Sequence, residues 1–186
     1  TPSAGRILLD GRDITGTPAS RVAHLGLARS YQRTSVFPAF SLLDNVWVAA
    51  FATGRSWRGL MWRKTDRYAE VTARARQALA DVGLAGKADA PAREISHGEQ
   101  RQLELAIALA AAPRVLLLDE PAAGLSPEET RNMVALVRSL NDEGLTIVMV
   151  EHVMHTIRWL CGNVVVLNAG RVIAAASIQR SKSSAL

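Results

Sequence analysis

The sequence is poor in cysteine and lacks long apolar runs. Its 186 residues include a single cysteine, Cys161, which has no second cysteine with which to form an internal disulfide. No stretch reaches the roughly 18 apolar residues that a bilayer crossing needs. The densest run, Leu105 to Ala112, ends at Pro113 and Arg114. The sequence therefore predicts a chain that does not span a membrane by itself, and a reducing compartment fits its cysteine content.

Lysine is scarce as well, and the excess of positive charge is small. Three of the 22 basic residues are lysines, and with 17 acidic residues the formal net charge is +5. A surplus of this size does not identify a nucleic-acid-binding protein. Basic residues gather between positions 55 and 67, interleaved with Trp57, Met61 and Trp62. A solvated loop leading into a helix is the simplest interpretation, and contact with RNA, anionic lipid or a partner is the alternative.

The remaining composition is that of a folded domain. Hydrophobic residues make up 48% of the chain and charged residues 21%, which is too apolar for a disordered chain. Strands are predicted at 5–10, 26–32, 115–118, 146–150 and 164–167, and helices at 42–52, 66–82, 100–112, 127–143 and 154–160. The runs 115–118 and 146–150 are typical of strands buried on both faces of a parallel sheet. This order predicts an α/β fold with an at least partly parallel sheet.

Two carboxylates follow the apolar run 115–118. Asp119 and Glu120 would lie at the carboxyl end of that strand, where open α/β sheets bind ligands. One acid can hold Mg²⁺ as an oxygen ligand while the other polarises a water molecule. By itself, the pair is more simply interpreted as acids in a surface turn.

Two further motifs flank this pair. The motif Ser96-His97-Gly98-Glu99-Gln100 opens a helix, and a hydroxyl with free N–H groups at a helix N-terminus forms an anion site. In isolation, a capping box between Ser96 and Glu99 explains the same residues. His152 closely follows the run 146–150 and is a candidate for sensing or proton transfer, although a polar strand end is the simpler interpretation of a lone histidine.

In this order, the three motifs resemble the signature, Walker B and switch histidine of ATP-binding cassette (ABC) ATPases. Tyr31-Gln32 with Phe37-Pro38 resembles that family's Q-loop, which lies where the ATPase meets its membrane partner. The resemblance covers about residues 5–173. The segments 26–32, 36–38, 96–104 and 120–127 look like the ATPase subunits of branched-chain amino-acid uptake systems.

The resemblance implies an α/β P-loop NTPase fold of the ABC ATPase type, with a mostly parallel sheet and a helical subdomain. It assigns residues 1–41 to the remainder of the N-terminal strand region and the Q-loop, and residues 42–95 to the helical subdomain. Residues 96–173 would hold the signature helix, Walker B and switch part of the core. Residues 174–186 form a tail that matches no pattern of the family.

The resemblance also implies which residues act on the nucleotide. Glu120 would polarise the attacking water, and His152 would stabilise the γ-phosphate in the transition state. Asp119 and Gln32 would hold Mg²⁺, and Gln32 would report the state of the site to the permease. ATP and Mg²⁺ are therefore the implied cofactors, and catalysis would rest on positioning and electrostatics.

The signature motif is expected to act on a second molecule. In the family, two ATPase subunits dimerise head to tail, so that Ser96 and Gly98, with Glu99 in the same motif, would bind the γ-phosphate of a nucleotide held by the opposite subunit. The implied partners are this second subunit, identical or related, and transmembrane permease subunits, with no nucleic acid. The implied location is cytoplasmic, peripheral on the inner face of the cell membrane.

The sequence departs from the family pattern in three places. His97 stands where the general signature has glycine, and Ser126 stands where many relatives have aspartate. The phosphate-binding pattern Gly-x-x-x-x-Gly-Lys-Ser/Thr is absent from the sequence, since Gly86-Lys87 is preceded by Asp81 at the first glycine position and followed by Ala88. We therefore expect a fold truncated at the N-terminus that begins downstream of this loop and carries half of the nucleotide site.

Two other functions remain open at this point. The missing phosphate loop favours a non-catalytic fragment or interaction module. A non-transport ABC ATPase acting on nucleic acid is the other alternative. The segment between Gln32 and Ser96 is long enough for a compact helical subdomain but too short for a long coiled-coil arm, which favours transport.

Overall fold

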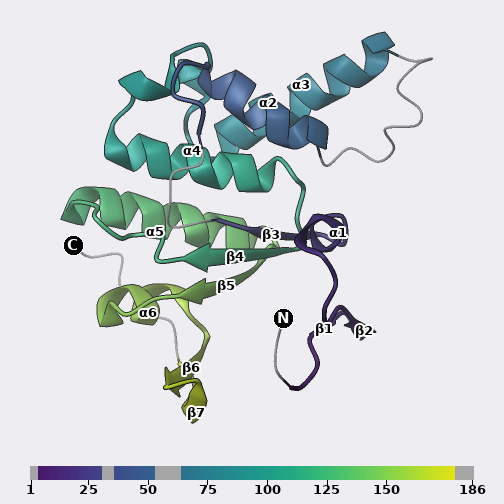
Figure 1. Cartoon of the computed structure of the whole chain (residues 1–186). Coiled ribbons are helices and arrows are strands. Elements are labelled where there is room, and N and C mark those ends of the chain that lie inside the picture. Colours follow the sequence, from purple (N-terminus) through teal and green to yellow (C-terminus); the bar gives the residue numbers. More distant parts are fainter. Residues whose placement is uncertain (1–3, 31–35, 53–63, 179–186) are drawn as a thin grey trace.

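The structure is a computed structural model that describes residues 4–30, 36–52 and 64–178. Figure 1 shows a group of helices above a small parallel sheet, and a hairpin near each end of the described chain. Within these ranges, no helix combines the length and the apolar character that a bilayer crossing needs.

Three parallel strands form the central sheet. Their order is β3 (Leu27–Arg29), β4 (Val115–Asp119) and β5 (Thr146–Val150). All pairings in this sheet are parallel, so the predicted α/β fold with a parallel sheet is confirmed. Leu116 and Leu118 on the central strand β4 are buried in the core.

The edge strand β5 differs from its prediction as a strand buried on both faces. Val148 and Val150 are 53% and 63% exposed, whereas Ile147 and Met149 pack against the core. Partly buried and exposed side chains thus alternate along β5, as in a strand with one covered face. Within the described ranges β5 pairs with β4 alone.

Three helices accompany the sheet: α4 (His97–Leu109), α5 (Pro127–Asp142) and α6 (Met154–Leu160). They confirm the predicted helices in these regions. α5 begins at a capping box in which Ser126 and Glu129 each accept an N–H of the other, and Pro127 occupies the first turn. Its apolar face is buried through residues at helical spacing: Met133, Val134, Val137 and Leu140.

The helical part of the molecule is formed by α2 (Leu42–Ala52) and α3 (Lys64–Asp81), followed by the short turns η2 (Ala85–Lys87) and η3 (Ala92–Glu94). α2 and α3 pack on each other and on α4, which places them above the sheet in Figure 1. One continuous core joins this part to β4, because buried residues of α2, α3, α4 and β4 belong to a single cluster. The two predicted helices are thus confirmed.

A hairpin lies near each end of the described chain, and only the first strand of each hairpin was predicted. β1 (Leu8–Leu9) pairs with β2 (Arg12–Asp13) and is shorter than the strand predicted at 5–10; α1 (Ala19–Ala23) follows. β6 (Asn163–Asn168) was expected to continue the parallel α/β order, and it pairs antiparallel with β7 (Arg171–Ser177) in a separate sheet.

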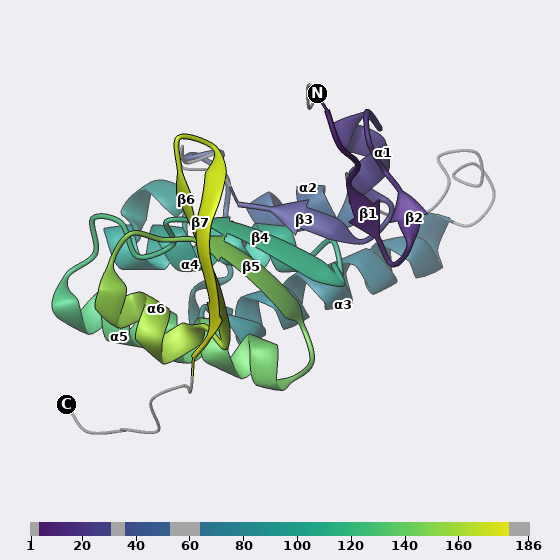
Figure 2. The same cartoon turned by 90° about the horizontal axis from the view of Figure 1, so that it is seen from below.

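The turn between β6 and β7 explains this difference. Ala169 and Gly170 both have positive φ, at 47° and 77°, which is the backbone of a tight two-residue hairpin turn. The hairpin lies below the sheet in Figure 1 and in front of it in Figure 2, which is seen from below. β7 also runs across the boundary expected between residues 173 and 174, so the tail assigned to 174–186 begins inside a strand.

Candidate functional site

The ends of β4 and β5 bring the two predicted catalytic residues together. In the parallel register Asp119 lies opposite Val150, so Glu120 and His152 leave the sheet side by side. Glu120 Oε1 lies 3.3 Å from His152 Nδ1, and the Glu120 N–H donates to the Val150 carbonyl at 3.0 Å. The side chains of His152 and Glu120 are 71% and 30% exposed, so both are accessible to a bound molecule.

The backbone at Glu120 turns sharply away from the strand. Its φ is +49°, in the left-handed region that residues with a Cβ seldom adopt. The Ala123 N–H donates to the Glu120 carbonyl at 3.0 Å and closes the turn. Strained residues of this kind gather at functional sites, where the surrounding structure holds them in place. The turn carries the Glu120 carboxylate to the histidine.

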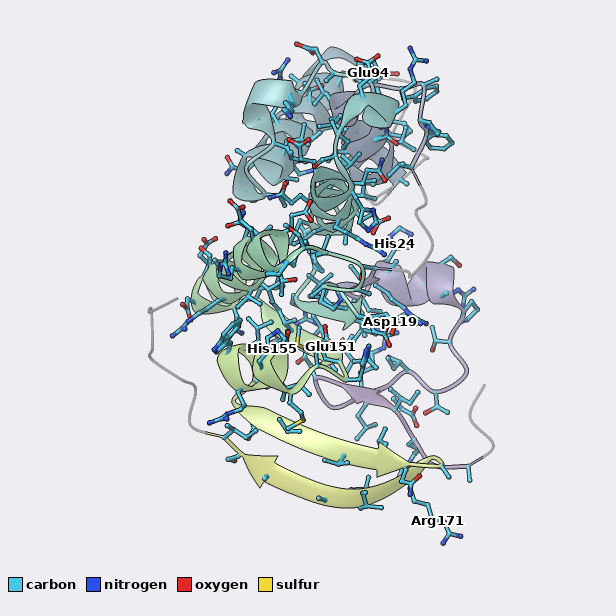
Figure 3. The ribbon with its side chains drawn as sticks, turned by 90° about the vertical axis from the view of Figure 1, so that its left-hand side faces the viewer. His24, Glu94, Asp119, Glu151, His155 and Arg171 are labelled. Carbon is cyan, nitrogen blue, oxygen red and sulfur yellow. The ribbon has the colours of Figure 1, made fainter. Side chains whose placement is uncertain are left out.

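Asp119 faces a cation from the neighbouring strand. Its Oδ2 lies 3.2 Å from a guanidinium nitrogen of Arg29, at the end of β3. The carboxylate is partly buried, at the edge of the sheet where Figure 3 labels Asp119. A carboxylate oxygen is the kind of ligand that Mg²⁺ takes, one or two from the protein with water and phosphate completing its shell, and Arg29 would have to leave Asp119 for the metal to bind. Arg29 was not among the residues predicted from the sequence.

The Glu151 side chain holds the backbone at His152. Its Oε2 accepts the backbone N–H groups of His152 and Val153 at 3.0 and 3.3 Å. The same carboxylate therefore fixes the chain between β5 and α6, and Glu151, labelled in Figure 3, directly follows the residue that pairs with Asp119. This role was missed because a glutamate at a strand end gives no sequence pattern that distinguishes it from a surface acid.

The predicted anion-binding motif opens α4 as a complete capping box. The Glu99 N–H donates to Ser96 Oγ at 3.2 Å, and Glu99 Oε2 accepts the Ser96 N–H at 3.0 Å. The ammonium of Lys87 lies 2.5 Å from the other carboxylate oxygen. The Lys87 hydrogen bond, followed by that from the Ser96 N–H, holds the pKa of Glu99 below its ordinary value. Glu99 thus stabilises the start of α4, and this role does not depend on a nucleotide.

A residue of α5 reaches the same motif. Glu129 Oε1 accepts the Gly98 N–H at 3.2 Å, and its Oε2 accepts the Ser126 N–H at 2.9 Å. A Cβ at position 98 would lie 2.6 Å from this carboxylate, so only glycine permits the contact in its present geometry. Hydrogen bonds from Ser126 first, and then from Gly98, lower the pKa of Glu129. Ser126-x-x-Glu129 is a capping-box pattern, but no pattern indicates the contact with Gly98.

The predicted site residues fall into two groups that do not share a pocket. Ser96, Gly98 and Glu99 line a pocket of about 450 Å³ with Glu129, and the described lining includes neither Glu120 nor His152. Gln32, predicted as a metal and nucleotide ligand, lies outside the described residues. Within the described ranges, no cluster of three or more His, Cys, Asp or Glu could hold a metal ion without further ligands.

The first group has the chemistry of a hydrolytic site. A carboxylate within hydrogen-bonding reach of a histidine can polarise water, while a second carboxylate one residue earlier can hold a cation. The N–H groups and hydroxyl of the second group are suited to an anion at a helix N-terminus. The two groups are therefore separate among the described residues of this chain.

Solved structures share this fold. An ATP-binding cassette from an ABC transporter, without nucleotide, aligns with a TM-score of 0.81 at 24% identity, over 95% of this chain and 71% of that chain. A dimeric cassette in a post-hydrolysis state, bound to ADP and Pi, aligns with a TM-score of 0.77 at 21% identity, over 96% of this chain and 75% of that chain. The fold is that of the P-loop NTPases, in the form of an ATP-binding cassette.

The sequence comparisons lead from this class to a family. The family described as "ABC transporter" matches residues 1–123. The high-affinity branched-chain amino acid transport ATP-binding protein BraF of Pseudomonas aeruginosa is 34% identical over 181 residues, 93% of this chain and 70% of its own length. LivG of Escherichia coli, which has the same description, is 33% identical with the same coverage. The methionine import ATP-binding protein MetN 1 of Rhodococcus jostii is 38% identical, over 92% of this chain and 48% of its own length.

The chain therefore belongs to the ABC transporter family, as an ATP-binding subunit. The activity of this family is ATP hydrolysis. The resemblance inferred from the signature, Walker B and switch-histidine motifs is confirmed.

Proposed function

We propose that this chain contributes the hydrolytic half of one ATP site, and the signature half of another, in an importer of branched-chain amino acids. The observation that carries the proposal is the 3.3 Å contact between Glu120 and His152, one residue beyond Asp119 at the carboxyl edge of a parallel sheet. The branched-chain substrate is supported by the relatives BraF and LivG, whose descriptions name it.

In the hydrolytic half, each residue has a distinct task. Glu120 accepts a hydrogen bond from the attacking water and orients it, and His152 stabilises charge that develops on the phosphoryl group. Asp119 and Gln32 would hold Mg²⁺, and the Asp119 carboxylate would then have to leave Arg29. Mg²⁺ neutralises phosphate charge when bound. Glu151 acts as a positioning residue, because it fixes the backbone of His152.

In the signature half, Ser96 and Gly98 bind the γ-phosphate of a nucleotide held by a second subunit, identical or related. Ser96 Oγ accepts a hydrogen bond within its helix cap, and its hydroxyl proton stays free to donate to a phosphate oxygen. The Gly98 N–H is held by Glu129, so a phosphate must displace that carboxylate. Glu99 holds the cap and thereby the geometry of both donors.

The permease subunits are proposed to dock on the segment 36–41 and on α2, the described part of the surface that follows the Q-loop. Phe37 and Phe40 are half exposed, and their rings stack with centroids 5.2 Å apart. The buried side chain of Asn45 holds this segment, accepting the Phe37 N–H at 2.7 Å and donating to the Phe37 carbonyl at 3.1 Å. Docking there places the protein peripherally on the inner face of the membrane. In this proposal residues 1–41 are the remainder of the N-terminal strand region and the Q-loop, residues 42–95 are the helical subdomain, and residues 96–173 are the signature, Walker B and switch part of the core.

A non-catalytic role of the 186 residues by themselves is the second candidate. The 186 residues contain no Gly-x-x-x-x-Gly-Lys-Ser/Thr loop to cradle phosphates. A titration of the chain alone with MgATP is expected to show binding weaker than micromolar. Micromolar binding would mean that the phosphate site has been placed wrongly.

The decisive experiment measures ATP turnover in the transporter complex that contains this chain. Glu120→Gln is expected to lower turnover by about 10²- to 10⁴-fold while ATP still binds, since it removes the group that polarises water. Glu128→Gln, the same change at an exposed position in the first turn of α5, is the matched control and should leave turnover unchanged. Equal turnover in the two variants would remove Glu120 from its role and favour the non-catalytic candidate.

A further inference from the structure

We propose that a pocket between α5 and α6 binds a small aromatic carboxylate. The pocket has a volume of about 520 Å³, within the usual range for small-molecule sites. Its apolar wall includes Leu125 and Pro127 before and at the start of α5, and Val153 and Trp159 around α6. The two helices contact each other and lie next to each other in Figure 2. The described lining of this pocket contains no residue assigned to the nucleotide.

A buried hydroxyl on the pocket wall points to a polar ligand. Thr156 lines the pocket and is 1% exposed, and its Oγ1 has no hydrogen-bond partner among the described residues. Buried hydroxyl groups in proteins are almost always paired, because an unpaired one has lost its bonds to water without replacement. Because Oγ1 itself is not accessible from the open pocket, a ligand oxygen would supply the missing acceptor after the Thr156 side chain rotates about χ1.

The charge of the pocket lining favours an anionic ligand. Arg131 lines the pocket from α5, is exposed, and forms no ion pair with any described residue. The described lining contains no carboxylate. Because a guanidinium presents two parallel N–H groups, it binds a carboxylate through both oxygens. Arg131 and Thr156 together therefore favour a carboxylate at the polar end of the ligand.

The aromatic side chains of α6 select the body of the ligand. His155, labelled in Figure 3, meets Trp159 edge to face, with ring centroids 5.2 Å apart and an interplanar angle of 68°. This contact restrains the indole in one orientation. A restrained indole beside Leu125 and Val153 offers a flat apolar surface, on which an aromatic ring gains more contact than a branched chain.

The pocket is connected to the loops of the hydrolytic half-site. Ala122, in its wall, lies two residues after Glu120, and Val153 directly follows His152. A ligand that fixes these loops would change turnover; this consequence rests on the proposed function, whereas the binding itself does not. The binding experiment therefore uses the 186-residue chain without nucleotide, so its failure is distinct from a failure of the ATPase assignment.

The test follows the fluorine spectrum of chain labelled with 5-fluorotryptophan, in which Trp159→Phe identifies the Trp159 signal. Phenylacetate is expected to shift that signal with a Kd of about 0.1–1 mM, typical of a ten-atom ligand. Phenylacetamide, which has the same shape without the charge, should bind at least about tenfold more weakly. Arg131→Gln should weaken phenylacetate binding by about tenfold, whereas Arg138→Gln, farther along α5 and outside the lining, should not change it.

Thr156→Val tests the buried hydroxyl separately. The variant should bind phenylacetate about five- to tenfold more weakly although it unfolds at a higher temperature than the natural chain, a combination that a purely structural role would not give. The proposal is overturned if the Trp159 signal does not move at about 10 mM phenylacetate, roughly ten times the weakest expected Kd. It is equally overturned if the amide binds as well as the acid, or if Arg131→Gln and Arg138→Gln bind alike.

Discussion

Replacing Thr156 by valine is expected to stabilise the free protein. The hydroxyl is buried without a partner among the described residues, a situation that costs about 1–3 kcal/mol in proteins. Valine has almost the same shape and helix propensity, and its extra methyl adds about 0.8 kcal/mol of apolar burial. Because one side of the residue borders the open pocket, we expect about 1–2 kcal/mol of added unfolding free energy in total.

This free energy corresponds to a measurable change in melting temperature. An unfolding entropy of about 2.1 cal/mol/K per residue gives about 390 cal/mol/K for 186 residues. A gain of about 1–2 kcal/mol then raises Tm by about 3–5 °C. Differential scanning calorimetry measures the shift, and urea unfolding with an unchanged m-value confirms that the compactness of both states is preserved.

A second threonine provides the matched control. Thr72 Oγ1 accepts a hydrogen bond from the indole N–H of Trp47 at 3.1 Å, so Thr72→Val leaves a half-buried donor without its acceptor. That variant should lose about 1 kcal/mol and about 2–3 °C. If Thr156→Val lowers Tm as Thr72→Val does, the Thr156 hydroxyl is hydrogen-bonded in solution, and the pocket loses its free donor.

Three further predictions concern the core and the caps. Asn45→Ala should lower the free energy of unfolding by about 2–4 kcal/mol, because the 3%-exposed amide holds both backbone groups of Phe37. It should also speed amide exchange in the segment 36–41, and unaltered exchange there would show that the segment is held by other contacts. Leu116→Ala, at a fully buried site on β4, should lower the free energy of unfolding by about 2–5 kcal/mol, as measured in urea. A decrease under about 1 kcal/mol would contradict the observed packing of Leu116. Since the Lys87 hydrogen bond, followed by that from the Ser96 N–H, lowers the pKa of Glu99 below its ordinary value, the stabilisation is complete above that ordinary value and is lost as pH falls through the lowered pKa. The melting temperatures of Glu99→Gln and the natural chain should therefore differ at pH 7 and converge in acid, and a constant difference at all pH values would contradict the ion pair.

The helices and most strands could be predicted because their signals are local. Period-3.6 apolar positions, Ser96 and Ser126 as caps, and Pro127 in a first turn each act within one or two helical turns. The exposed face of β5 could not be predicted, since a five-residue strand with four apolar residues looks the same at the edge of a sheet as in its centre. The β6–β7 hairpin was missed because its turn, Ala169-Gly170, uses a left-handed alanine rather than the more typical Asn-Gly.

Local sequence patterns also predict some residues of the candidate site and not others. Glu120 and His152 were predicted from strand ends, and parallel register brings them to 3.3 Å. Arg29 and Glu129, by contrast, act on residues that are far from them in sequence, at Asp119 and Gly98. Contacts of this kind depend on how elements pack, and a single sequence contains no local pattern that specifies them.

The left-handed backbone of Glu120 has a consequence for attempts to improve this protein. A glycine there would adopt φ +49° without the steric cost that a Cβ imposes, so a library screened only for heat resistance should enrich glycine at position 120. The same variants would lack the carboxylate that faces His152. Selection for robustness and selection for turnover thus oppose each other at a single residue, and a screen that retains function must score both.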